Sequence, residues 1–99
     1  MPTHEETDRF WRDWKRLSAD EKRRFLEVVK RFSEDLEQRP PGQFRKGIRV
    51  KSMQGADGIF EIAWAPNGRA TFEYGRERTK GDPHIVWRRI GGHDIFGSP

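Results

Sequence analysis

Apolar residues recur at helical spacing near the start of the chain, with charged residues between them. This spacing is typical of an amphipathic helix. Thr3-His4-Glu5-Glu6 has the form of a capping box, in which Thr3 caps the helix and Glu6 reaches back. We therefore expect a first helix over about residues 4–17. Its apolar residues are Phe10, Trp11, Trp14 and Leu17.

A second capping box, Ser18-Ala19-Asp20-Glu21, follows almost at once. It predicts that one helix ends near Leu17 and that another begins at about residue 19. Pro40-Pro41 stops this second helix, because proline cannot continue the hydrogen-bond ladder. The expected range is 19–38, and two helices joined by so short a break form an αα-hairpin. The apolar stripe of the second helix is Phe25, Val28, Val29, Phe32 and Leu36.

After the prolines the apolar period changes from 3.6 to 2, which is typical of half-buried strands. We expect strands over about residues 48–53, 59–65, 69–75 and 84–90. Pro66-Asn67-Gly68 carries the Asn-Gly signal of a tight hairpin between the second and third strands. The loops between strands are shorter than ten residues, so the strands are expected to be antiparallel.

These elements predict an α+β fold in which the N-terminal αα-hairpin packs on one face of a four-stranded antiparallel sheet. The opposite face is then open to water and ligands. Alternation places one of Arg88 and Arg89 on that face, but both faces of this strand are mixed and the pattern does not decide between the two. The other residues expected there are Arg49, Lys51, Arg69, Thr71 and Glu73.

Composition supports one small domain over residues 1–99. Apolar content is only 32%, but twelve large aromatic residues can still build a core. The absence of cysteine excludes disulfides and cysteine-based metal sites. No apolar leader and no run of about 18 apolar residues is present. We therefore expect a soluble cytoplasmic protein with no membrane association.

Positive charge is concentrated in the second part of the chain. Residues 1–40 carry ten basic and ten acidic residues, whereas residues 41–99 carry ten basic and six acidic ones. His84 and His93 lie in the same part. An anionic partner such as RNA, DNA or an acidic peptide would be attracted there. The alternative is that a net charge of +4 serves only solubility.

Three stretches give the chain a resemblance to a known family. They are Phe44–Lys51, Asn67–Phe72 and Arg89–Asp94, the last reading Arg-Ile-Gly-Gly-His-Asp. With two helices followed by strands, their order resembles the RelE/ParE superfamily of toxins from bacterial type II toxin–antitoxin systems. The resemblance covers roughly residues 5–96.

The resemblance implies a toxin that cleaves messenger RNA on the ribosome, with a cognate antitoxin protein as its partner. The chemistry is attack of a ribose 2′-OH on the adjacent phosphate, which requires proton transfer and cations rather than a metal or a small-molecule cofactor. The family match assigns catalytic roles to His93, Arg69 and Arg89. Phe96 falls near the position of a terminal aromatic residue, and Lys51 matches a phosphate contact.

Each assignment has a simpler alternative. His93 can cap the turn after Gly91-Gly92, and Arg69 can be an exposed strand residue paired with Glu61 or Glu73. Asp94 can orient the His93 imidazole or cap a turn. Arg49 and Lys51 can bind RNA phosphates, including those of ribosomal RNA, or simply keep an edge strand soluble.

The sequence also departs from the nucleases of this family. Their second strand presents basic residues, where this chain has Glu61 and Ala63. Phe96 can stack on a base but cannot transfer a proton. Two further readings follow from the thinner set of catalytic groups: a ParE-like toxin that poisons DNA gyrase, and an inactive protein-interaction module of the same fold.

Overall fold

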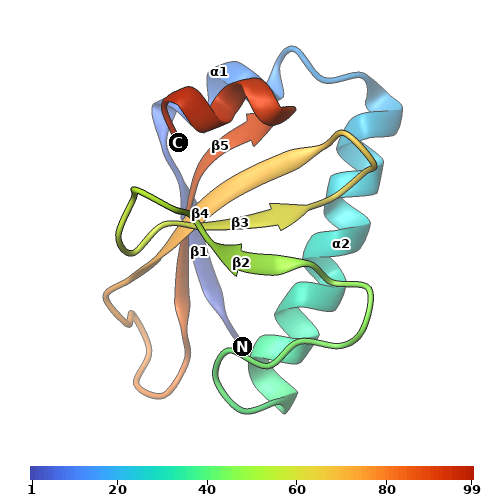
Figure 1. Ribbon diagram of the computed structural model, residues 1–99. Coiled ribbons are helices and arrows are strands. Elements are labelled where there is room, and N and C mark those ends of the chain that lie inside the picture. The colour runs from blue at the N-terminus through green and yellow to red at the C-terminus, as the bar shows by residue number, and fades with distance from the viewer.

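The computed structural model describes all 99 residues and shows an α+β fold built on one sheet (Figure 1). The elements occur in the order β1 (Thr3–Glu6), α1 (Asp8–Trp14), α2 (Ala19–Gln38), β2 (Val50–Ser52), β3 (Phe60–Ala63), β4 (Arg69–Gly75), β5 (His84–Gly91) and the 3-10 helix η1 (His93–Gly97). The strand order across the sheet is β1-β5-β4-β3-β2. Strands β2 to β5 form the expected antiparallel set.

The prediction of a four-stranded sheet was wrong, because residues 3–6 form a fifth strand instead of the first turn of a helix. β1 pairs in parallel with β5, so the sheet is mixed. Thr3 is therefore not a helix cap; Thr7 caps α1, and its hydroxyl accepts from the Phe10 N–H. The same hydroxyl donates to the Arg88 carbonyl, which ties the start of α1 to β5.

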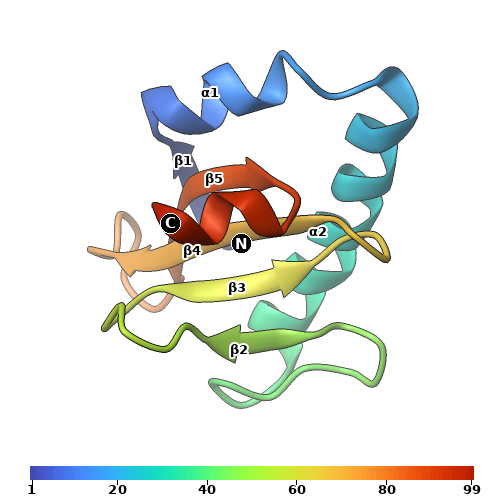
Figure 2. The same cartoon turned by 45° about the horizontal axis from the view of Figure 1, so that its top comes forward.

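The two helices form a wider arrangement than the predicted compact hairpin. Figure 2 shows α1 crossing one end of the sheet while α2 runs behind it. The helices meet through aromatic side chains, with Phe10 and Trp14 each about 6 Å from Phe25 between ring centroids. Trp11, part of the predicted stripe, is 46% exposed. A seven-residue α1 is too short to bury all the aromatic residues of its stripe against the sheet and α2.

The core lies between α2 and the sheet. Phe32 of α2 and Phe72 of β4 are almost fully buried, with ring centroids 5.1 Å apart, and Trp87 of β5 packs on both. Phe44, before β2, stacks on the outer side of Phe32. The buried stripe of α2 consists of Phe25, Val28 and Phe32, as its helical period predicts.

The face of the sheet turned away from α2 is partly covered by η1, which lies in front of β4 and β5 in Figure 2. Ile95 of η1 is 1% exposed, and Thr71 of β4 is fully buried. The predicted open face is therefore open only over β2, β3 and the start of β4. No helix in the structure combines the length and apolar character that crossing a membrane requires.

Candidate functional site

A basic hollow lies on the open part of the sheet, where β2, β3 and the start of β4 run side by side. Its volume is about 150 Å³, and it is lined by Arg49, Val50, Lys51, Glu61, Ala63 and Arg69. Three of these side chains are cationic and one is a carboxylate. The predicted grouping of Arg49, Lys51 and Arg69 on one face is therefore present in the structure.

Arg69 is held in place by the hairpin that precedes it. Its Nη1 donates to the carbonyls of Ala65, Pro66 and Gly68 at 2.8–3.3 Å. It forms no ion pair, so the alternative of a pair with Glu61 or Glu73 is not what the structure shows. Carbonyl oxygens orient a guanidinium without cancelling its charge. Arg69 is thus a fixed cation that can still attract an anion.

Lys51 and Arg49 differ in their partners. Lys51 is 74% exposed and its Nζ lies 3.6 Å from Glu61, its cross-strand neighbour in β3. This contact reduces the positive charge of the hollow but leaves the lysine mobile enough to reach a ligand. Arg49 is exposed and forms no ion pair. The sequence analysis considered Glu61 as a partner of Arg69, whereas the structure pairs it with Lys51.

His93 does not line this hollow, but the pairing of β4 with β5 brings it to the same end of the sheet as Arg69. Arg69 pairs with Gly91, so His93 follows only two residues after the partner of Arg69. The end of β5 lies against the β3–β4 hairpin, since a Cβ built on Gly92 would be 3.3 Å from the Asn67 carbonyl oxygen. His93 is exposed, and its ring stacks on Phe96 with centroids 5.5 Å apart.

Asp94 caps the turn instead of orienting the imidazole. Its Oδ1 accepts from the Gly92 N–H at 3.1 Å, and no hydrogen bond joins it to His93. Of the two roles considered from the sequence, the turn-capping one is therefore observed. This cap fixes the direction in which η1 leaves β5, and so it influences where the His93 ring lies.

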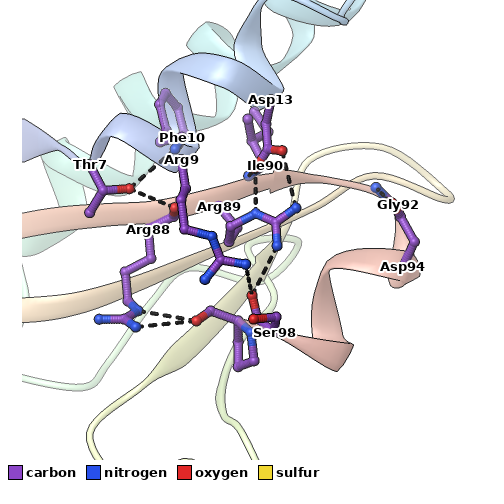
Figure 3. A network of polar contacts seen from close by, with 11 residues as sticks. Thr7, Arg9, Phe10, Asp13, Arg88, Arg89, Ile90, Gly92, Asp94 and Ser98 are labelled. Atoms are coloured by element: carbon purple, nitrogen blue, oxygen red, sulfur yellow. Dashed lines mark hydrogen bonds and ion pairs between the residues drawn. The ribbon is translucent and has the colours of Figure 1, made fainter.

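Strict alternation along a strand predicts that Arg88 and Arg89 point to opposite faces of the sheet, but in the structure they do not. Thr71 pairs with Arg89 and Phe72 with Trp87, which leaves Arg88 as the extra residue of a β-bulge. The bulge lets both arginines reach the end of the chain (Figure 3). Arg88 donates to the Pro99 carbonyl, and Arg89 donates to the Ser98 carbonyl at 3.0 Å.

Arg89 is also paired with a carboxylate of α1. Its Nε and Nη2 donate to Asp13 at 2.6 and 3.1 Å, and Asp13 raises the pKa of Arg89 above its ordinary value. A phosphate could be contacted by this guanidinium only if some of these bonds opened. Sequence reasoning missed Asp13, which lies between Trp11 and Trp14 and has the pattern of a solvated helix residue.

His84 lies at the opposite end of β5 from His93 and is buried. Its Nδ1 lies 2.7 Å from the Thr3 hydroxyl and its Nε2 lies 2.8 Å from a Glu5 carboxylate oxygen. The hydrogen bond with His84, and then that with Arg78, lowers the pKa of Glu5. His84 therefore holds β1 against β5 and is separate from the basic hollow. No group of three or more His, Asp or Glu side chains is arranged as a metal site.

Comparison with known proteins gives matches in structure only. No protein-family model and no curated protein sequence matches the chain. The YoeB/ParE toxin from Agrobacterium tumefaciens superposes with a TM-score of 0.64 at 12% identity, over 92% of this chain and 98% of that one. A chain of the RelB–RelE antitoxin–toxin complex from Methanococcus jannaschii superposes with a TM-score of 0.62 at 15% identity, over 93% of each chain.

YafQ from E. coli strain BL21(DE3) gives a TM-score of 0.60 at 12% identity, over 96% of this chain and 97% of that one. These matches cover nearly the whole of each chain. The protein therefore has the fold of the RelE, YoeB, YafQ and ParE toxins of toxin–antitoxin systems.

Proposed function

We propose that this protein is the toxin of a type II toxin–antitoxin system and that it cleaves messenger RNA on the ribosome without a metal. The observation that carries the proposal is the pairing of Arg69 with Gly91. It supports the proposal because Arg69, a cation without an acidic partner, lies opposite the end of β5, and η1 with His93 and Phe96 follows that end. The toxin fold supports the same proposal.

In the proposed reaction the ribose 2′-OH attacks the adjacent phosphorus, and the bond from phosphorus to the 5′ oxygen breaks. His93 accepts the 2′ proton, because an imidazole nitrogen can act as a general base. Arg69 binds the scissile phosphate and offsets the negative charge that grows on its oxygens. The leaving 5′ oxygen takes a proton from water or from the protonated imidazole. The products are a 2′,3′-cyclic phosphate on one RNA fragment and a 5′-hydroxyl on the other.

Phe96, Lys51 and Arg49 bind the rest of the substrate in this proposal. The Phe96 ring stacks on His93 and offers its edge and outer face to a base. Lys51 and Arg49 contact neighbouring phosphates or ribosomal RNA across the hollow. Arg89 stays a prediction as a catalytic residue, since Asp13 and Ser98 occupy its donors in this structure.

The cognate partner would be an antitoxin protein acting in the cytoplasm. Two of the structurally similar proteins were solved as antitoxin–toxin complexes, RelB–RelE from M. jannaschii and DinJ–YafQ from E. coli. For this chain we expect an antitoxin that covers the basic hollow, because a competitor for RNA must neutralise the same cations. A short neighbouring gene for a DNA-binding protein would support this arrangement.

Brief expression followed by primer extension on cellular messenger RNA tests the nuclease proposal. Wild type should produce codon-phased cuts, and His93→Ala and Arg69→Ala should each reduce them by about 100-fold or more, in the range that loss of a proton-transfer group or a charge-stabilising donor gives. Arg76→Ala is a matched control, because Arg76 is exposed in the β4–β5 loop away from the hollow. If both site variants cut like wild type, the site assignment is wrong even where the nuclease activity is real.

A ParE-like toxin that poisons DNA gyrase is the second candidate. It is favoured by the pairing of Lys51 with Glu61 and of Arg89 with Asp13, which neutralises two of the cations expected for RNA cleavage. The same cultures separate the candidates. DNA-damage induction without messenger RNA cuts supports the gyrase poison, and the absence of both effects supports an inactive interaction module.

A further inference from the structure

Asp13 of α1 is a carboxylate with three hydrogen bonds to β5. It accepts from Arg89 Nε at 2.6 Å, from Arg89 Nη2 at 3.1 Å and from the Ile90 backbone N–H at 3.1 Å. Its side chain is 11% exposed and that of Arg89 is 16% exposed. A bidentate pair with so little solvent is geometrically strict, so Asp13 fixes the plane of the Arg89 guanidinium.

The third nitrogen of Arg89 points toward the end of the chain. Nη1 donates to the Ser98 carbonyl at 3.0 Å, and Arg9 of α1 donates to the same oxygen at 3.2 Å (Figure 3). Arg88 holds the next carbonyl, that of Pro99, and pairs with Glu73 at 3.2 Å. The segment that follows η1 is therefore attached to α1 and β5 by three arginines.

The helix η1 needs these attachments because it is a single five-residue 3-10 turn with few hydrogen bonds of its own. Asp94 caps its start, Ile95 buries its middle against Gly91, and the arginines hold its end. Phe96 lies between Ile95 and the segment that the arginines hold, and its ring stacks on that of His93, the first residue of η1. We expect release of the end of η1 to free Phe96 and, through this stacking, the His93 ring.

We propose that Asp13 is a positioning residue of the site: through Arg89 and the Ser98 carbonyl it holds η1, and so sets the place of the His93 imidazole after Gly91, the strand partner of Arg69. The expected effect of Asp13 on RNA cleavage rests on the proposed nuclease function. Its expected effect on the position of η1 and His93 does not. Asp13 lies on α1, 80 residues from His93 in the sequence, and touches neither His93 nor the hollow. It reaches the end of η1 through Arg89, and its bond with the Ile90 N–H also holds the end of β5.

The positional part is tested by NMR on Asp13→Asn, which keeps the shape of the side chain but removes its charge. We expect the His93 imidazole resonances to move and backbone amide exchange over residues 95–98 to rise about tenfold. Asp57→Asn removes the same charge from an exposed turn and should leave both signals unchanged. Unchanged His93 resonances and exchange rates in folded Asp13→Asn would overturn the proposal.

Arg9→Ala keeps the test valid if Asp13→Asn does not fold. Arg9 is exposed and its guanidinium donates to the Ser98 carbonyl, so its loss should loosen η1 without opening the buried pair. The expected change has the same direction and a smaller size, about threefold in amide exchange. An unchanged exchange rate in this variant would also count against the proposal.

Cleavage kinetics test the catalytic part. Asp13→Asn should lower kcat about tenfold while KM changes less than twofold, because the hollow that binds RNA is intact. Asp13→Glu, which retains the charge, should recover part of kcat. A rise in KM with unchanged kcat would overturn the positioning role. The absence of any recovery of kcat in Asp13→Glu would overturn it too. If wild type cleaves no RNA, the nuclease proposal fails, and the NMR result still decides whether Asp13 holds η1.

Discussion

Gly68→Ala is the perturbation whose cost the structure defines best. A Cβ built on Gly68 would lie 2.5 Å from Trp64 Cε2 and 2.6 Å from Trp64 Cδ2. Ordinary contacts between carbon atoms are about 3.5–4.0 Å, so the indole or the hairpin must move by about 1 Å. Trp64 is 6% exposed and its ring meets Phe25 edge to face, so it has little room to move.

The expected cost follows from two opposing terms. Forcing an extra carbon into a packed core costs about 1–3 kcal/mol. Replacing glycine by alanine also restricts the unfolded chain, which offsets about 0.4–1 kcal/mol. The steric term wins, and the net loss of about 1–2 kcal/mol should lower Tm by roughly 5–15 °C in a domain of this size.

Thermal and urea unfolding followed by tryptophan fluorescence and circular dichroism measures this change. Gly97→Ala is the matched control, because its Cβ would meet no atom within 4 Å and its φ is not positive. The control should be neutral or slightly stabilising. If Gly68→Ala and Gly97→Ala have the same Tm within 2 °C, the reasoning from close approach to Trp64 is refuted.

Three further changes follow from the structure. Phe32→Ala removes a 1% exposed ring packed on Phe72 and should lower the free energy of unfolding by about 3–5 kcal/mol in urea titrations; a loss below about 1 kcal/mol would contradict the described core. Thr7→Ala removes the cap of α1 and its bond to β5 and should cost about 1 kcal/mol, whereas Thr7→Ser should retain most of it. The hydrogen bonds from Arg45 lower the pKa of the Asp35 carboxyl below its ordinary 3.8. Its stabilising contribution is therefore present above pH 3.8 and lost as the pH falls through the lower folded-state pKa, so Asp35→Asn should be less stable than wild type at pH 6, by a margin that shrinks as the pH falls below 3.8. Equal stabilities of wild type and Asp35→Asn at pH 6 would contradict a stabilising role of the Asp35 carboxylate.

Local sequence signals predicted the elements that carry their own boundary information. The second helix occupies residues 19–38 because a complete capping box starts it and two prolines follow it. β4 occupies residues 69–75, the expected range. The Asn67-Gly68 hairpin before it also formed, although neither residue has a positive φ. Glycine is needed at position 68 for the close approach to Trp64, not for a left-handed turn.

The candidate site was predicted in its residue types but not in its connections. Alternation along β2 and β4 grouped Arg49, Lys51 and Arg69, because side chains two residues apart share a face. The same rule failed at Arg88 and Arg89, where one extra residue in β5 shifts the register. A bulge depends on how the partner strand is held, and no residue of β5 alone signals it.

What the sequence determined by itself is therefore local: helix α2, strands β2 to β5, the hairpin, and the basic side chains of the open face. Capping, turn chemistry and periodicity act over a few residues, and each can be seen in the residues that produce it. The tertiary structure alone decided that residues 3–6 join β5 as a strand, that Asp13 holds Arg89, and that η1 covers part of the open face. Each of these depends on groups about 75 to 80 residues apart or on the packing of a whole layer, so no short stretch of the chain encodes it.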